Sequence, residues 1–192
     1  GAGDMPGKLV FATNSDGTTT TSTRMVINDT GDIEVKTGSI LVEGTGKGIY
    51  LGGTGAANLL DDYEEGTWTP VIRDLAGNQA STSSATGTYR KIGDQIIANY
   101  DVRLSSKGSM TGNYVLLALP FTHAGATCGT GIIDKFNNMG TAFSSMTWDV
   151  TSTNTVAWLM GVEGTSATSS VYVTVAEIAN DTKFKGTIIY HQ

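Results

Sequence analysis

The sequence predicts an all-β protein, with a short glycine-rich β shaft element followed by an antiparallel β-sandwich or jelly-roll head. Three observations lead to this prediction. Thr, Val and Ile alternate with turns that contain Gly and Asn, and few stretches of Ala, Leu, Glu and Lys are long enough for a helix. Aromatic residues gather in the later part of the chain. The 192 residues suffice for one good core and an additional extended piece.

Residues 1–57 form the predicted shaft element. The first sixty residues contain twelve of the 25 glycines but only two of the fifteen aromatic residues, Phe11 and Tyr50. Strands this short and apolar surface this small hardly offset the entropy of ordering one chain alone. We therefore expect association of identical chains to supply the missing core. The apolar residues that it would bury are Ile27, Ile33, Val35, Ile49 and Leu51.

Residues 58–67 form a predicted acidic neck between the two larger parts. The stretch NLLDDYEEGTWTPVI begins at Asn58, and residues 61–74 carry a net charge of −4 out of −6 for the whole chain. Charge runs of this kind are typical of a solvated linker. Pro70, just after the neck, fits a first strand at the edge of a sheet.

Residues 68–192 form the predicted head, which contains all three Trp residues and about nine strands. Gly93-Asp94 predicts a two-residue hairpin turn, followed by period-two alternation that buries one strand face. A three-residue loop at 152–154 would pair Trp148 with Trp158. This register adds two further apolar pairs on the same face, so we expect both indoles in the core. The added pairs are Val150 with Val156 and Met146 with Met160.

Composition excludes several classes of function. The net charge of −6 and the absence of a basic cluster larger than Arg90-Lys91 argue against nucleic-acid binding. The uncharged run at 108–133 is interrupted by Gly, Asn and Pro, and only Val115–Leu119 is continuously apolar, which predicts a buried strand and no membrane insertion. Cys128 is the single cysteine, so the chain forms no internal disulfide, and a buried apolar role is expected.

Catalytic and metal motifs are missing from the sequence. His123 and His191 lack metal-ligand spacing, and we expect both to be exposed structural residues. The turn around Lys47 fails the phosphate-loop spacing, and Asn14–Thr18 lacks the later ligands of a calcium loop. No nucleophile elbow is present. The sequence therefore predicts no catalytic residue, no metal site and no cofactor.

Binding candidates are polar or aromatic residues that alternate away from buried strand faces. Asn99, Asp101 and Arg103 project opposite Ile96 and its neighbours, and they offer the hydrogen bonding that a polar glycan needs. An ordinary solvated face is the alternative interpretation. Tyr172 opposes a valine-rich face and adds one aromatic ring. Small-residue loops that could form a tip are Ser105–Asn113, Thr122–Gly129, Asn137–Ser145 and Gly161–Ser170.

Three sequence blocks resemble the C-terminal part of bacteriophage tail-fibre and tail-spike proteins. The block from MPGKLVFATNSDGT to DTGDIEV resembles a shaft-end element. The acidic DDYEEGTWTP stretch resembles the neck before a terminal domain. GTYRKIGDQIIANYDVRL with the later LPF is similar to the receptor-binding β-domain. The resemblance implies a homotrimer at the distal end of a virion tail fibre, attached to the rest of the phage tail.

The resemblance also implies a partner and leaves alternatives open. The expected partner is a host cell-surface glycan, lipopolysaccharide or capsule, or a surface protein, bound without catalysis. The chain has no repeats for a large β-helix, so an inherited depolymerase activity is not expected. A small glycan-degrading or deacetylating enzyme, a purely structural virion component and a monomeric carbohydrate-binding module are the alternatives. In a trimer, a divalent cation could relieve repulsion among the neck carboxylates.

Overall fold

The protein is all-β and divides into two compact units. The computed structural model describes residues 7–123, 129–150, 155–164 and 169–192. Contacts separate residues 1–48 from residues 49–192, which is earlier than the predicted boundary at residue 57. The described part of the chain includes no helix with the length and hydropathy that a membrane span requires.

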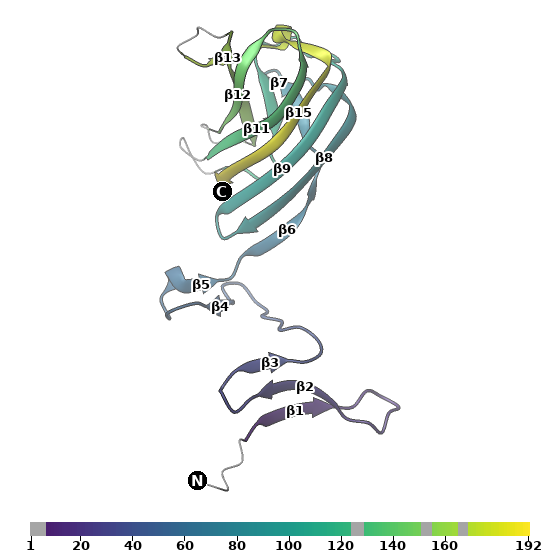
Figure 1. The fold of residues 1–192 in the computed structure, drawn as a ribbon, viewed down its shortest axis with the longest axis vertical. Coiled ribbons are helices and arrows are strands. Elements are labelled where there is room, and N and C mark those ends of the chain that lie inside the picture. The colour runs from purple at the N-terminus through teal and green to yellow at the C-terminus, as the bar shows by residue number, and fades with distance from the viewer. Residues whose placement is uncertain (1–6, 124–128, 151–154, 165–168) are drawn as a thin grey trace. The chain divides into compact units, whose positions relative to one another are not determined.

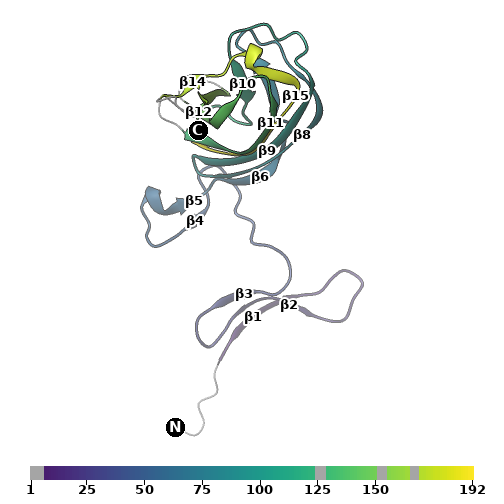
Figure 2. The same cartoon turned by 45° about the horizontal axis from the view of Figure 1, so that its top comes forward.

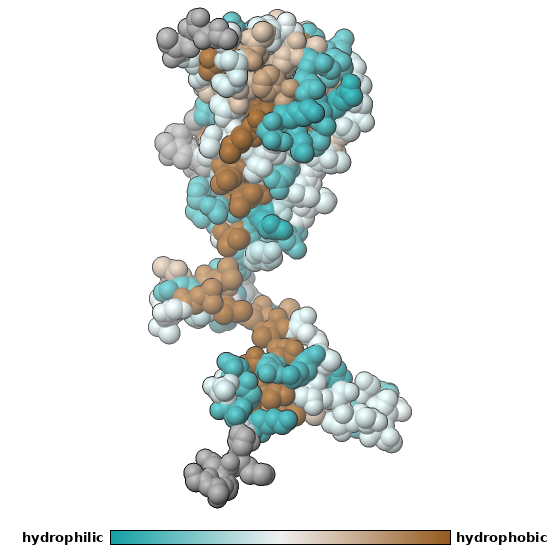
Figure 3. Space-filling model, viewed as in Figure 1, coloured by the Kyte–Doolittle hydropathy of each residue, from teal (hydrophilic) through white to brown (hydrophobic). Residues whose placement is uncertain are grey.

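The first unit is one small antiparallel sheet with almost no core. Val26 is its single buried apolar residue in the part that the structure describes. Apolar side chains lie exposed on the sheet, and Figure 3 shows them between hydrophilic residues. The strands are β1 (Leu9–Thr13), β2 (Ser22–Ile27) and β3 (Ile33–Val35), in the order β1-β2-β3. The exposed residues include Leu9, Val10, Phe11, Ile33 and Val35.

The second unit begins with a small two-stranded sheet. β4 (Ile49–Tyr50) pairs with β5 (Leu59–Leu60), and a short 3₁₀ turn, η1 (Ala56–Asn58), joins them. Asn58 stabilises this connection because its side-chain Nδ2 donates to the carbonyl of Leu51 at 2.9 Å.

The head is one ten-stranded antiparallel sheet that curls around a single core (Figures 1 and 2). The strand order is β6-β8-β9-β15-β11-β12-β13-β10-β7, with β14 paired to β13. This architecture confirms the predicted fold class. The long strands are β6 (Tyr63–Trp68), β8 (Ser81–Ile92), β9 (Gln95–Ser106), β11 (Gly129–Met139), β12 (Phe143–Val150), β13 (Val156–Glu163) and β15 (Ile178–His191). The short elements are β7 (Val71–Asp74), β10 (Val115–Ala118), β14 (Val171–Tyr172) and the 3₁₀ turn η2 (Val175–Glu177).

The first predicted hairpin is confirmed. Ile92 pairs with Gln95 across a turn in which Gly93 has a φ of 59°, a conformation that glycine adopts without a steric cost. β9 then alternates between buried and more exposed residues, as the period-two pattern predicted. Its buried side chains join the core of the head. The largest fully buried side chains of that core include Trp148, Tyr190, Phe184, Ile72 and Leu104.

The second predicted hairpin has a different register, which corrects the placement of one tryptophan. Trp148 lies opposite Leu159, and Trp158 lies opposite Asp149, one residue away from the predicted Trp148–Trp158 pair. A shift of one residue reverses the face of every side chain. Ala157 and Leu159 therefore fill the buried positions, Trp148 stays fully buried, and Trp158 turns to the outer face. The predicted loop at 152–154 lies outside the described residues, as does Cys128.

The acidic stretch is more than a solvated linker, since its second half belongs to the head sheet. β6 pairs along its length with the end of β8. Charges are complementary across this pairing, because β8 ends in the basic pair Arg90-Lys91. The Nζ of Lys91 also lies 2.8 Å from a carboxylate oxygen of Asp62. The facing charged pairs are Glu64 with Lys91 and Glu65 with Arg90.

The two histidines differ in environment. His191 is exposed, as predicted, and its Nδ1 lies 3.5 Å from a carboxylate oxygen of Asp94. His123 is fully buried, which contradicts the expected exposure. Its ring packs edge-on against Tyr190 with centroids 6.5 Å apart, and neither ring nitrogen has a hydrogen-bond partner among the described residues. The strand-end position visible in the sequence did not indicate that the curled sheet closes over this side chain.

Asp74 is a buried carboxylate that joins two loops. It accepts hydrogen bonds from the backbone N–H and side chain of Asn78, at 2.8 and 3.0 Å, and from the N–H groups of Thr111 and Gly112, both at 2.9 Å. Burial alone raises the pKa of Asp74, but these four bonds outweigh burial and hold the pKa well below its usual range. The carboxylate therefore has a structural role.

Candidate functional site

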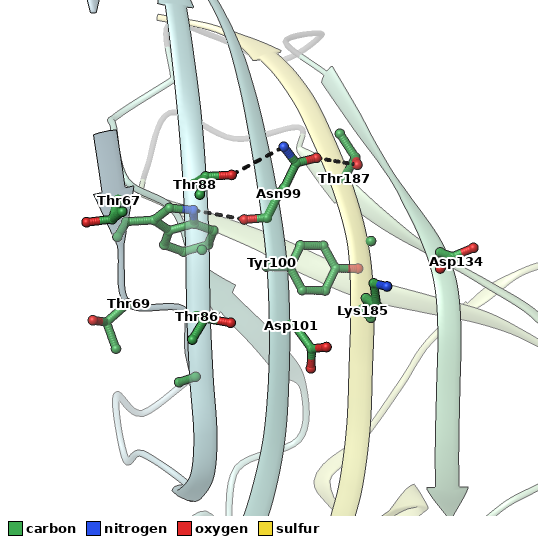
Figure 4. Close-up of a pocket in the computed structure, with 14 residues that line it drawn as sticks. Thr67, Thr69, Thr86, Thr88, Asn99, Tyr100, Asp101, Asp134, Lys185 and Thr187 are labelled. Carbon is green, nitrogen blue, oxygen red and sulfur yellow. Dashed lines mark hydrogen bonds between the residues drawn. The ribbon is translucent and has the colours of Figure 1, made fainter. Parts of the chain in front are cut away.

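An open groove of about 810 Å³ crosses β6, β8, β9, β15 and β11 of the head. Residues that alternate with buried positions of these strands supply its polar side chains (Figure 4). Hydroxyl groups predominate, accompanied by one amide, two carboxylates and one ammonium group. The polar side chains central to the groove are Thr86, Thr88, Asn99, Asp101, Lys185 and Thr187.

Two glycines let the strands pack tightly beneath the groove. Gly87 and Gly186 lie opposite Tyr100 on its two neighbouring strands. A Cβ added to Gly186 would lie 2.7 Å from the Tyr100 hydroxyl oxygen, and one added to Gly87 would lie 2.7 Å from ring carbons of Trp68. Trp68 also crosses toward β9, where its Nε1 donates to the carbonyl of Asn99 at 3.2 Å. A side chain at Gly87 would therefore collide with Trp68, and one at Gly186 would collide with the Tyr100 hydroxyl and the backbone carbonyl of Ile132.

Asn99 is held at the centre of the groove by its cross-strand neighbours. Thr88 and Thr187 lie directly opposite Asn99 on β8 and β15. The Asn99 Nδ2 donates to Thr88 Oγ1 at 3.4 Å, and Thr187 Oγ1 donates to Asn99 Oδ1 at 2.7 Å (Figure 4). A side-chain ladder therefore runs across three strands and orients the amide.

Asp101 provides a charged group beside this ladder. The Nζ of Lys183 lies 2.9 Å from both carboxylate oxygens and donates a hydrogen bond to Oδ2. Oδ1 lies at ion-pair distance but accepts no hydrogen bond from the described residues. Oδ1 is buried, so Asp101 serves mainly as the partner of Lys183 beneath the groove.

The structure brings together two of the four predicted binding residues. Asn99 and Asp101 both line the groove. Arg103 is the next exposed residue on the same face of β9, opposite Lys183, but it does not line the groove. Tyr172 lies on β14 and contacts other aromatic rings.

The sequence reasoning missed the contributions of the strands beside β9. Thr86 and Thr88 follow a visible alternation along β8, but only the register places them opposite Asp101 and Asn99. Lys185 and Thr187 come from β15, more than eighty residues later in the chain. No local pattern indicates that the last strand of the chain inserts beside β9.

A pair of carboxyl groups lies elsewhere, between β13 and η2. A hydrogen bond with Glu177 raises the pKa of the exposed Glu163. Burial raises the pKa of Glu177, but hydrogen bonds from the backbone N–H and hydroxyl of Thr174, at 2.6 and 2.8 Å, outweigh it and lower the pKa. The catalytic carboxyl groups of glycosidases are separated by about 5–10 Å. Glu163 and Glu177 are hydrogen-bonded to each other and so lie too close for that arrangement. The described residues contain no cluster of His, Cys, Asp or Glu suited to a metal ion.

Comparisons with known proteins show a related fold. No family model and no curated protein sequence matches this chain. Among solved structures, the crystal structure of the Dettilon tailspike protein (gp208) is similar, with a TM-score of 0.57 and 19% sequence identity. The match covers 67% of this chain and 24% of that chain, so the matched part corresponds to about a quarter of the tailspike chain. At this level of identity, the likeness shows that about two thirds of this chain shares its fold with part of a tailspike protein.

Proposed function

We propose that this chain is the receptor-binding end of a bacteriophage tail fibre or tail spike. In this proposal it lies at the distal end of the virion tail and binds a host cell-surface glycan without catalysis. Support comes from the tail-fibre resemblance of three sequence blocks and from the fold that about two thirds of the chain shares with part of a tailspike protein. The observation that carries the proposal is the open polar groove on this fold.

The groove has the chemistry that a polyhydroxylated ligand needs. Threonine hydroxyls and the Asn99 amide both donate and accept, the Lys185 ammonium donates, and the exposed carboxylate of Asp134 accepts. Asn99 and Asp101 are already oriented by their neighbours, so little side-chain entropy is lost on binding. On binding, glycan hydroxyls would replace hydrogen bonds to water by hydrogen bonds to these groups. The net gain is small, so each site would bind weakly, as is usual for a shallow polar surface.

We further propose that three chains associate, which would turn weak sites into strong attachment. The first unit leaves large apolar residues exposed, and one copy of it has almost no core. Identical chains packed on these residues would remove apolar surface from water at about 25 cal/mol per Å². Three parallel heads would then present three grooves at once, and effective concentration would raise the avidity by orders of magnitude.

Binding of fluorescently labelled protein to a panel of bacterial strains tests the proposal. With a strain that binds wild-type protein, Asn99→Ala and Lys185→Ala should each weaken binding at least about fivefold, since each removes a hydrogen-bonding group. Asn137→Ala is the matched control, because Asn137 is an exposed asparagine of β11 that does not line the groove. Unchanged binding by both groove variants, with thermal stability retained, would contradict the assignment of the groove.

A glycan-degrading or deacetylating enzyme is the second candidate, because Asp101 and Asp134 both line the groove. Release of reducing ends or acetate from host polysaccharide, abolished by Asp134→Asn, would support this alternative. A chain that binds none of the strains and releases no product would instead be a structural component of the virion.

A further inference from the structure

Three aromatic rings gather on the head at strands that do not border the groove. Tyr114 precedes β10, Trp158 lies in β13 and Tyr172 lies in β14. The ring centroids are 5.5 Å apart for Tyr114–Trp158, 5.6 Å for Tyr114–Tyr172 and 5.5 Å for Trp158–Tyr172. Each ring therefore contacts the other two, and we call this group the aromatic cluster.

The register places the aromatic cluster on the outer face of the sheet. Trp158 lies directly opposite Asp149 on one side and Leu116 on the other, so these three side chains share a face. The neighbouring Leu159 points to the opposite face and is buried in the core. Tyr172 is 40% exposed, and Tyr114 and Trp158 are partly exposed. The rings are therefore accessible at the surface while remaining fixed by one another.

Polar groups border the aromatic cluster on two sides. The hydroxyl of Tyr172 donates to a carboxylate oxygen of Asp149 at 3.3 Å. On the other side, Arg73 lies opposite Leu116, on the same face as Trp158. The Nε of Arg73 is buried and has no hydrogen-bond partner among the described residues. The cluster is thus an apolar platform bordered by the carboxylate of Asp149 on one side and by the guanidinium group of Arg73 on the other.

We propose that the aromatic cluster binds the apolar face of a hexopyranose, as a second sugar site separate from the groove. This inference deepens the proposed function and rests on it for its biological role. A pyranose has C–H groups on one face and hydroxyls around its edge, so it matches an aromatic platform with a polar border. Another protein surface would need a continuous apolar area, which Asp149 and Arg73 interrupt.

The site lies apart from the groove in the order of strands. The cluster lies on β13, β14 and the residue before β10, whereas the groove uses β6, β8, β9, β15 and β11. A long glycan could therefore engage the head at two places, one that recognises hydroxyls and one that stacks on a ring. Rigid aromatic side chains suit this role because they supply contact area at a low entropic cost.

Fluorine NMR of the full chain labelled with fluorotryptophan tests the site directly. The three tryptophans give three resonances, and Trp158→Phe assigns one of them. Titration with a panel of methyl hexopyranosides should shift the Trp158 resonance in a saturable way with at least one sugar. The resonance of the buried Trp148 should stay in place, and that of Trp68, which lines the groove, reports on that site separately. Tyr172→Ala should weaken that affinity at least about fivefold, the loss expected for one ring contact.

Tyr63→Ala is the matched control, because Tyr63 is an exposed tyrosine of β6 outside the cluster. The inference is wrong if no sugar in the panel shifts the Trp158 resonance, or if Tyr172→Ala and Tyr63→Ala bind equally well. Binding to cells separates this result from the proposed function. If a sugar shifts the Trp158 resonance but the protein attaches to no strain, the sugar site stands and the receptor role is rejected. If cells are bound through the groove but no sugar shifts the Trp158 resonance, the proposed function stands and the sugar site at the aromatic cluster is rejected.

Discussion

The indole Nε1 of Trp148 donates a 2.7 Å hydrogen bond to the hydroxyl oxygen of Tyr100 inside the head. The two rings meet edge to face with centroids 6.2 Å apart, and Trp148 is fully buried. The pair joins β12 to β9 across the core, and Tyr100 lies directly beneath the groove. Burial raises the pKa of Tyr100 well above its usual range, even though the bond from Trp148 opposes this rise, so the hydroxyl stays protonated.

Removing the Tyr100 hydroxyl should destabilise the head without unfolding it. Tyr100→Phe leaves the buried indole N–H without its acceptor, and we expect a loss of about 1–3 kcal/mol in the free energy of unfolding. Trp148→Ala removes the whole ring and should cost about 3–5 kcal/mol. Urea unfolding monitored by circular dichroism measures both. Equal losses for the two variants would show that the hydrogen bond, and not the packing of the ring, is the dominant contribution.

Gly131 should not tolerate a larger side chain. A Cβ at this position would lie 2.7 Å from the Cβ of Trp148 and 2.7 Å from Cγ1 of Ile188, both in the buried core. Gly131→Ala should therefore lower the free energy of unfolding by about 1–3 kcal/mol through overpacking. Gly55→Ala serves as the control, since its nearest neighbour would be an Asn58 oxygen at an ordinary 3.6 Å. A melting temperature of Gly131→Ala that equals that of the control contradicts the packing argument.

Acid should remove the stabilising contribution of Asp74. Its pKa in the folded state is depressed from the ordinary value of 3.8, so its contribution is fully present above that value and is lost as the pH falls toward the folded pKa. Asp74→Asn should cost about 3 kcal/mol at neutral pH, because charged hydrogen bonds are lost. The difference between wild type and variant should shrink as the pH falls below about 4. Unfolding curves at several pH values measure this, and a constant difference would exclude the titration of Asp74 as the cause.

The first unit should hold the chains together as a trimer. Light scattering on a sizing column should give three times the chain mass of 20.0 kDa. Phe11 is 45% exposed in one chain. Phe11→Asp would place a charge in the proposed contact between chains and should lower the mass measured by light scattering. Thr20→Asp, in an exposed loop of the same unit, is the control. A wild-type mass near that of one chain would remove the basis of the avidity argument.

Chelation should leave the thermal stability of the acidic segment unchanged. Three of its acids already have partners in the described structure. Asp62 pairs with Lys91, Glu65 lies 3.4 Å from Arg90 Nε, and Glu64 accepts a hydrogen bond from the hydroxyl of Tyr89. Lys91 and Arg90 thus neutralise two of these carboxylates without a bound metal ion. The melting temperature with and without EDTA measures this, and a drop that magnesium reverses would instead support a divalent cation among the neck carboxylates.

Local patterns in the sequence were sufficient to predict much of the fold. They also identified two residues, Asn99 and Asp101, that line the groove. The period-two alternation after the Gly93-Asp94 turn placed Asn99 and Asp101 on the outer face of β9, because side-chain direction in a strand depends only on parity. The same logic failed for Trp158. Its direction depends on the register with β12, and a one-residue change in that register turns it outward. The sequence therefore predicted a core residue where the structure has an aromatic surface cluster.

By itself, the sequence determined the all-β class, the weak core of the first unit and the first hairpin of the head. These follow from composition and from interactions between near neighbours, which any folded form of the chain must satisfy. Only the tertiary structure decided the insertion of β15 between β9 and β11, the burial of His123 and the gathering of Tyr114, Trp158 and Tyr172. Each depends on pairing between distant strands, and the free energy of that pairing is set by how the whole sheet closes around its core rather than by any local pattern.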